Sequence, residues 1–72
     1  MEEKNILYNF GLNLKICRQK RKMSQEELSE LTGFSIPYIS NVELGKHNIS
    51  LNSALKFAKV FDKNIEDMIK EL

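Results

Sequence analysis

The sequence is poor in the residues that interrupt or cross-link a chain. Its 72 residues include one proline, three glycines, one cysteine and no tryptophan. Cys17 therefore cannot form an internal disulfide or a multi-thiolate metal site, and its place in an apolar stripe predicts a packing role. No apolar run approaches the roughly 18 residues of a membrane span, and the N-terminus is acidic where a signal peptide is basic. We therefore expect a cytoplasmic protein that does not enter the membrane.

Groups that serve catalysis are also scarce. His47 is the only histidine, and no Cys or Asp lies near it to complete a triad or a metal site. A Gly-rich phosphate loop is lacking. Glu26, Glu27 and Glu30 follow the pattern of a solvated helix face rather than of a catalytic pair. We expect no enzymatic activity, no metal site and no cofactor.

What the chain does contain fits one small globular domain spanning residues 1–72. The formal net charge is only +1, but basic residues gather before Ser24 and acidic residues gather near the C-terminus. Such a dipole would turn a basic face toward nucleic acid. The same cations would also complement the C-terminal dipole of a helix, so the charge alone leaves both interpretations open.

Helical spacing of the apolar residues predicts an all-α fold of five helices without strands. The first helix runs from about Asn5 to Arg21, the second begins at Ser24 and the third runs to about Leu44. The fourth is capped by Ser50 and the fifth by Asn64. The residues expected in the core, from the first helix to the fifth, are Leu7, Phe10, Leu14 and Cys17; Leu28 and Leu31; Ile39 and Val42; Leu51, Leu55, Ala58 and Phe61; and Ile65, Met68, Ile69 and Leu72.

The segment from Ser24 to Leu44 has the pattern of a helix-turn-helix, formed by the second and third helices. Ser24 and Glu27 have the spacing of a capping box at a helix start. Gly33 can adopt the left-handed conformation that ends a helix, and Ser35 can cap the next one. Two helices joined by such a turn can lie across a phosphate backbone and enter a major groove.

An ordered set of short motifs extends this pattern along the chain. They are Arg18, Met23-Ser24-Gln25-Glu26-Glu27-Leu28, Gly33-Phe34-Ser35, Tyr38-Ile39-Ser40, Glu43-Leu44-Gly45-Lys46, Ser50-Leu51, Leu55-Lys56-Phe57-Ala58-Lys59 and Ile65. In this order they resemble the lambda-repressor-like helix-turn-helix domains, also called the Cro/C1-type or XRE family. The resemblance covers residues 11–69. It implies a compact five-helix lambda-repressor-like domain that binds double-stranded DNA sequence-specifically to regulate transcription.

The resemblance also implies structural roles. Gln25 would lie near a phosphate and brace the recognition helix, Ser29 would allow close approach where the family usually has Ala, and Ile39 would anchor the recognition helix to the core. Arg18 and Glu43 would form a buried or half-buried ion pair between the first and third helices. Removing one partner of such a pair costs about 3 to 5 kcal/mol, so we assign both residues to structure rather than to DNA contact.

The expected DNA contacts lie on the third helix and its flanks. The expected base contacts are Ser35, Ile36, Pro37, Tyr38, Ser40 and Asn41. The expected phosphate contacts are Lys22, Ser24, Gln25, Lys46, His47 and Asn48, with Arg21 as a further candidate. Asn41 is the strongest base reader, because an amide can donate to and accept from adenine at once. Ile36 and Pro37 depart from the family pattern of Gln, Arg or Ser. Ile36 could touch a thymine methyl or lie in the core, and Tyr38 could contact DNA or pack its ring.

We expect a homodimeric repressor or autoregulatory controller, of the phage-repressor or restriction-modification controller type, on a two-fold symmetric operator. The dimer interface could use Ile69 and Leu72 or Ile6 and Leu7. An alternative is a protein-interaction module on the same fold, such as an antitoxin or antirepressor, because a fold does not fix a function. The mild net charge and the uncharged recognition face favour this alternative, whereas the cations near Ser24 favour DNA.

Overall fold

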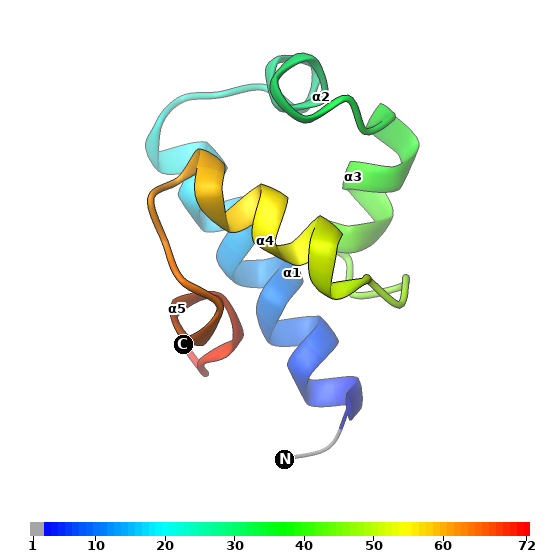
Figure 1. Cartoon of the computed structure of the whole chain (residues 1–72), viewed down its shortest axis with the longest axis vertical. Helices are drawn as coiled ribbons and strands as arrows, with labels where there is room; N and C mark the ends of the chain where they lie inside the picture. Colours follow the sequence, from blue (N-terminus) through cyan, green and yellow to red (C-terminus); the bar gives the residue numbers. More distant parts are fainter. Residues whose placement is uncertain (1–2) are drawn as a thin grey trace.

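Five helices with short connections make up residues 3–72, which the computed structural model describes (Figure 1). They are α1 (Glu3–Lys20), α2 (Gln25–Thr32), α3 (Ile36–Glu43), α4 (Leu51–Val60) and α5 (Ile65–Ile69). The predicted all-α class is confirmed, and the predicted helix ends differ from the observed ones by only a few residues. Among the described residues, no helix is long and apolar enough to cross a membrane.

The helices after α1 all begin at side-chain caps that the sequence predicted. The N-caps are Ser24, Ser35, Ser50 and Asn64. At α2 the Ser24 hydroxyl accepts from the Glu27 N–H, and the Glu27 carboxylate accepts from the Ser24 N–H. Gly33 ends α2 with a φ of 80°, and its N–H donates to the Ser29 carbonyl oxygen. These caps satisfy backbone groups that a helix end leaves without partners.

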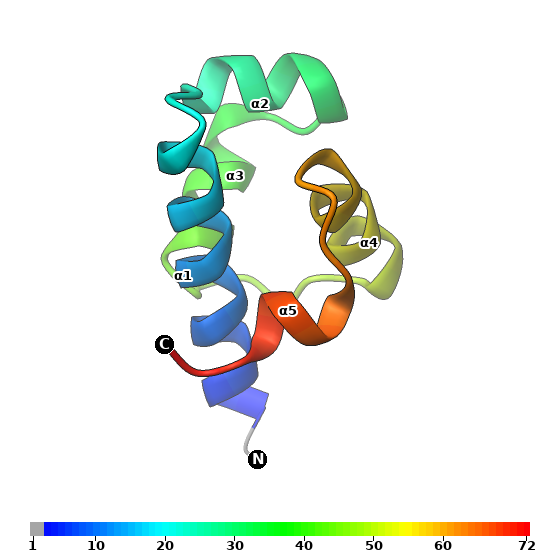
Figure 2. The same ribbon diagram turned by 90° about the vertical axis from the view of Figure 1, so that its left-hand side faces the viewer.

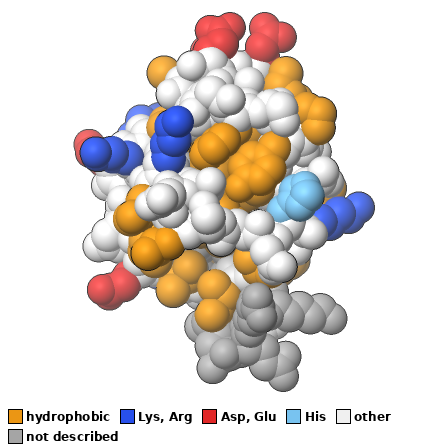
Figure 3. Space-filling view, turned by 45° about the vertical axis from the view of Figure 1, so that its right-hand side comes forward, with side chains coloured by type: hydrophobic (Ala, Val, Ile, Leu, Met, Phe, Trp, Pro, Cys, Tyr) orange, Lys and Arg blue, Asp and Glu red, His pale blue; other side chains and the backbone are white. Residues whose placement is uncertain are grey.

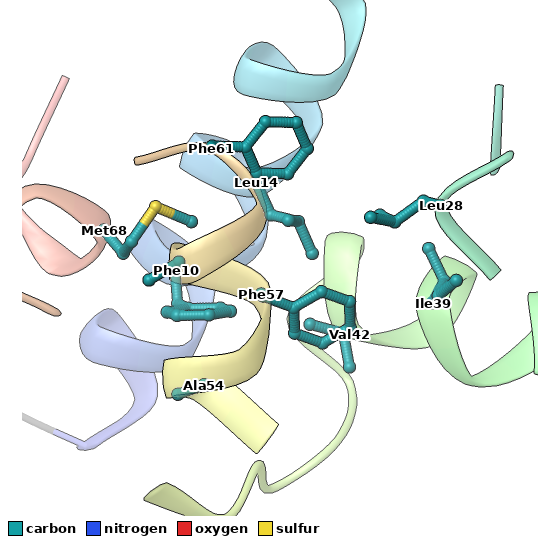
Figure 4. Packing of buried hydrophobic residues seen from close by; sticks show 10 residues of the cluster. Phe10, Leu14, Leu28, Ile39, Val42, Ala54, Phe57, Phe61 and Met68 are labelled. Atoms are coloured by element: carbon teal, nitrogen blue, oxygen red, sulfur yellow. The ribbon is translucent and has the colours of Figure 1, made fainter. Parts of the chain in front are cut away.

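The helices enclose one hydrophobic core. Figure 2 shows α1 and α4 on opposite sides, with α2 at one end and α5 at the other. Every helix sends side chains inward, and Figure 4 shows them pointing toward one another. The buried residues are Phe10, Leu14, Leu28, Ile39, Val42, Ala54, Phe57, Ala58, Phe61 and Met68. Burial of this apolar cluster is the main force that holds such short helices together.

Two leucines predicted to be buried lie on the surface at α2 and after α5. Leu31 is 60% exposed, because α2 buries Thr32 together with Leu28 on the adjacent turn. The Thr32 hydroxyl donates to the Leu28 carbonyl oxygen, which makes a threonine tolerable there. Leu72 is 69% exposed, because α5 ends at Ile69 and the chain leaves the core.

The predicted core face of α4 was also partly wrong. Leu51 and Leu55 are 67% and 47% exposed. The face of α4 that points inward carries Ala54, Phe57 and Ala58, and Phe61 follows at its C-cap. The two leucines lie on the neighbouring face, since residues three and four apart share one side of a helix. The other predicted core residues are buried or half-buried.

Helix α1 crosses the end of α3 without room for a side chain at Gly11. A Cβ added to Gly11 would lie 2.8 Å from the Glu43 carbonyl oxygen and closer still to that of Val42. The glycine therefore allows two backbones to approach each other closely. This contact sets how α3 sits on the rest of the domain.

Two buried asparagines of α1 hold the end of α5. The Asn13 side-chain amide donates to the carbonyl oxygens of Met68 and Lys70, each at 3.0 Å. The Asn9 amide donates to the Ile69 carbonyl oxygen at 3.2 Å. These bonds satisfy carbonyl groups at the C-terminus of a helix that has only five residues.

Candidate nucleic-acid interface

Helices α2 and α3 meet through a turn of residues 33–35, as expected for a helix-turn-helix. The Ser29 hydroxyl donates to the Phe34 carbonyl oxygen and so ties the end of α2 to this turn. On α3, Ile39 and Val42 are buried against the core. The opposite side of α3 is therefore left at the surface, as the periodicity of a helix requires.

An ion pair fixes α3 to α1. The Arg18 guanidinium donates to both carboxylate oxygens of Glu43, through Nε at 2.7 Å and Nη2 at 3.1 Å. The two side chains are only 11% and 4% exposed. The Gln25 amide adds a third bond to the Glu43 carboxylate at 3.1 Å, so α2 joins the same group. Paired and hydrogen-bonded in this way, the carboxylate has a structural role, and its charge is balanced by the guanidinium.

The outer face of α3 begins with three exposed residues, Ser35, Ile36 and Pro37, and continues to half-buried Ser40 and Asn41. Ile36 is 40% exposed, so the interpretation of this residue as part of the core is wrong. Within the described residues the Asn41 side-chain amide makes no hydrogen bond, which leaves both its donor and its acceptor free. An uncharged, hydrogen-bonding surface of this kind can be matched to the edges of base pairs.

Tyr38 belongs to this helix but packs its ring. The ring centroid lies 5.1 Å from that of Phe34, 5.6 Å from that of His47 and 6.4 Å from that of Phe57. Figure 3 shows the histidine beside hydrophobic side chains at the centre of this face, with acidic side chains only at its margins. The Tyr38 ring is therefore packed, while its base contact stays a prediction.

The expected phosphate contacts lie in two connections. Lys22 and Ser24 are exposed in the connection before α2, and Lys46, His47 and Asn48 are exposed in the loop after α3. Figure 1 places these connections at opposite ends of the helix pair. Gln25, at the first position of α2, is half-buried. Cations and polar groups at both ends could hold the two sides of a phosphate-lined groove.

Two further basic residues lie in or just after α1. Arg21, a further candidate for phosphate contact, donates to the Val60 carbonyl oxygen at 2.9 Å and lies 5.2 Å above the Phe61 ring. It therefore caps the end of α4. Lys15, one of the basic residues that gather before Ser24, lines a surface pocket of about 230 Å³ with Gln25 and Ser40. It stands three residues before Arg18, on the same side of the helix.

Comparison with known proteins agrees with this geometry. The profile of the helix-turn-helix family matches residues 14–68. Among solved structures, the chain is similar to the restriction-modification controller protein C.AhdI from Aeromonas hydrophila. The TM-score is 0.78 and the sequence identity is 35%, over 86% of this chain and 94% of that chain.

The sequence relatives are regulators as well. An HTH-type transcriptional regulator of Archaeoglobus fulgidus is 44% identical over 55 residues, which are 76% of this chain and 78% of the relative. Control protein C.SmaI of Serratia marcescens is 29% identical over 69 residues, which are 96% of this chain and 79% of the relative. Both alignments span most of this chain and most of the relative, so the likeness is not confined to one short motif.

Proposed function

Because the chain belongs to the XRE-type helix-turn-helix family of DNA-binding transcriptional regulators, we propose that it binds a two-fold symmetric operator as a homodimer. It would act as a repressor or as an autoregulatory controller. The similarity to a restriction-modification controller protein, C.AhdI, and to control protein C.SmaI favours the controller type. The observation that carries the proposal is the hydrogen-bonding outer face of α3, which the Arg18–Glu43 pair holds in place and which lies between connections with exposed cations, Lys22 before α2 and Lys46 after α3.

Base recognition would come from this outer face. The proposed base contacts are Ser35, Ile36, Pro37, Ser40 and Asn41. Asn41 would pair with adenine, since its amide is free within the described residues and can donate and accept together. The exposed apolar atoms of Ile36 and Pro37 would meet thymine methyl groups, which are the apolar feature of the major groove.

Phosphate contacts would come from both ends of the helix pair. The proposed contacts are Lys15, Lys22, Ser24, Gln25, Lys46, His47 and Asn48. At the start of α2, the capping box uses the N–H groups of Ser24 and Glu27, which leaves those of Gln25 and Glu26 for a phosphate at the positive end of the helix dipole. A phosphate there would be held by backbone and side chain together, with the Lys15 ammonium beside it.

A second copy of the chain would dock on an apolar groove of about 310 Å³. The aliphatic residues that line it are Ile6, Leu7, Ile49, Leu51, Ala54, Ile65 and Ile69. The groove brings Ile6 and Leu7 together with Ile69, so the two interfaces considered from sequence share one surface, without Leu72. Leu51 is 67% exposed at its edge. Because a two-fold interface is self-complementary, Leu51 of each copy could enter the groove of the other.

Selection of bound duplexes from a random pool tests the proposed DNA binding. We expect enrichment of a two-fold symmetric site and an affinity that falls steeply with salt. Asn41→Ala should relax the preference at one position per half-site, at a cost of about 1 to 3 kcal/mol. Asn5→Ala, an exposed asparagine on α1, is the matched control and should bind like the wild type. A folded sample that enriches no duplex would overturn the proposal.

Sedimentation of Leu51→Glu tests the proposed dimer. We expect a monomer, because a carboxylate cannot enter the apolar groove without losing its hydration. Leu31→Glu is the matched control: this leucine is 60% exposed on α2 and does not line the groove, so the variant should remain a dimer. A dimeric Leu51→Glu protein would rule out this surface.

A protein-interaction module, such as an antitoxin or antirepressor, is the second candidate. The formal net charge of only +1 favours it, and Leu31, exposed on α2 outside the groove, is the side chain that we would test. In this case the folded protein would enrich no duplex, and Leu31→Glu would weaken binding to the protein partner.

A further inference from the structure

Three aromatic rings connect the core to the loop after α3. Phe57 is fully buried, Tyr38 is half-buried and His47 is exposed. The Tyr38 ring is stacked with both others, at 12° to the plane of Phe57 and 30° to the plane of His47. Phe34 packs against Tyr38 at 54° and against Phe57 at 47°. Tyr38 is thus the link between a rigid ring and a surface loop.

The loop of residues 44–50 is anchored at its two ends, and the His47–Tyr38 stack is the contact in its middle. At its start, the Lys46 N–H donates to the Asn41 carbonyl oxygen at 2.9 Å. At its end, Ile49 packs against the core and Ser50 caps α4. Within the described part of the chain, residues 47–49 make no hydrogen bond between these two anchors. The stacking of His47 on Tyr38 is the side-chain contact that holds the exposed middle of the loop.

We propose that Tyr38 is a positioning residue, not a base contact. Its ring, held by Phe57, is the platform on which His47 stacks, and this fixes the loop with Lys46 and Asn48 facing the phosphates. A loop ordered before binding loses less conformational freedom when it meets DNA. The proposal rests on the proposed DNA binding and assigns Tyr38 an indirect part in it.

The test compares two substitutions on the duplex selected from the random pool. Tyr38→Phe keeps the ring and should bind within about twofold of the wild type. Tyr38→Leu keeps an apolar side chain against Phe57 but removes the stack. It should lose about tenfold in affinity, which is near the upper end of the free energy that an aromatic pair contributes. The loss should be equal on the selected duplex and on a scrambled one, because phosphates carry no sequence information. The salt slope should fall by about 1 or more as a phosphate contact is lost.

Substitution of His47 tests the other ring of the same stack. His47→Ala should lose at least as much affinity, because it removes the proposed phosphate contact of His47 as well as the stack. Adding Tyr38→Leu to it should cause little further loss, since the stack is already gone. NMR of the free protein gives a readout without DNA. In Tyr38→Phe the ring protons of His47 should keep their wild-type ring-current shift, and in Tyr38→Leu they should lose it.

A structural control separates loop positioning from general destabilisation. Val60→Ala removes half-buried packing at the far end of α4 and should bind normally at temperatures where it is folded. The inference is overturned if Tyr38→Phe loses as much affinity as Tyr38→Leu, or if the base preference relaxes at one position. Absence of any selected duplex for the wild type would instead overturn the proposed function, while the NMR shifts would still test the stack.

Discussion

Replacing Gly11 by alanine should destabilise the domain, although alanine is the better helix former. A Cβ at Gly11 would lie 2.8 Å from the Glu43 carbonyl oxygen and nearer to that of Val42. A close C···O contact is about 3.3 Å, so α1 and α3 would have to separate by more than about 0.5 Å. Both obstructing atoms belong to the backbone, and no side-chain rotation can relieve the contact.

The magnitude follows from two opposing effects. Alanine in place of glycine stabilises a helix interior by about 1 kcal/mol. Overpacking costs about 1 to 3 kcal/mol, and the upper end applies where the backbone must move. We therefore expect a net loss of about 2 kcal/mol in the free energy of unfolding, which lowers the melting temperature by about 8 to 16 °C for a domain of this size.

Thermal unfolding followed by circular dichroism measures the effect, with Gly33→Ala as the control. Gly33 has a φ of 80°, but a Cβ added there would meet nothing within 4 Å, so only the left-handed conformation is penalised. That penalty is about 1 kcal/mol, which corresponds to about 4 to 8 °C. A Gly11→Ala protein that melts at or above the wild-type temperature would show that the two backbones do not meet as described.

Substitutions at three further positions test the contacts that support α3 and α5. Glu43→Gln should lower the free energy of unfolding in urea by about 3 kcal/mol, because it leaves the buried Arg18 guanidinium without its counter-charge; an unchanged midpoint would refute the ion pair. Asn13→Ala should cost about 1 to 3 kcal/mol and speed amide hydrogen exchange at the C-terminal end of the chain, where two carbonyl groups lose their donor; unaltered exchange would contradict this. Ser35→Ala should cost about 1 kcal/mol in thermal melting and Ser35→Asn much less, since only the first removes the cap of α3; equal losses would argue against a capping role.

Helix starts were predictable because their determinants are local. Ser24 with Glu27 and Asn64 with Asp67 make their contacts across three residues of sequence, and both are capping boxes in the structure. The buried faces were harder to predict. Helix α4 carries apolar residues around more than one side, and Leu55 fits a helical stripe as well as Phe57 does. Which face turns inward depends on packing against distant helices, which periodicity does not report.

In the candidate site, too, some features could be predicted from local sequence and others depend on contacts between distant residues. The Arg18–Glu43 pair joins residues 25 apart in sequence, and only the family resemblance pointed to it. The outer face of α3 followed from periodicity once Ile39 was assigned to the core. The packing of Tyr38 depends on where the loop places His47, and no local pattern determines that. The individual DNA contacts remain predictions.

The carboxylate of Glu43 binds groups from two other helices, while the proposed base contacts lie elsewhere on α3. In the proposed function, attachment to the scaffold and base recognition thus fall to different side chains of one eight-residue helix. An exposed position such as Ile36 can be exchanged with little effect on stability, because surface substitutions rarely change it by more than about 0.5 kcal/mol. A domain built in this way can acquire a new operator by a few substitutions and keep its scaffold, which makes it suited to divergence and to redesign.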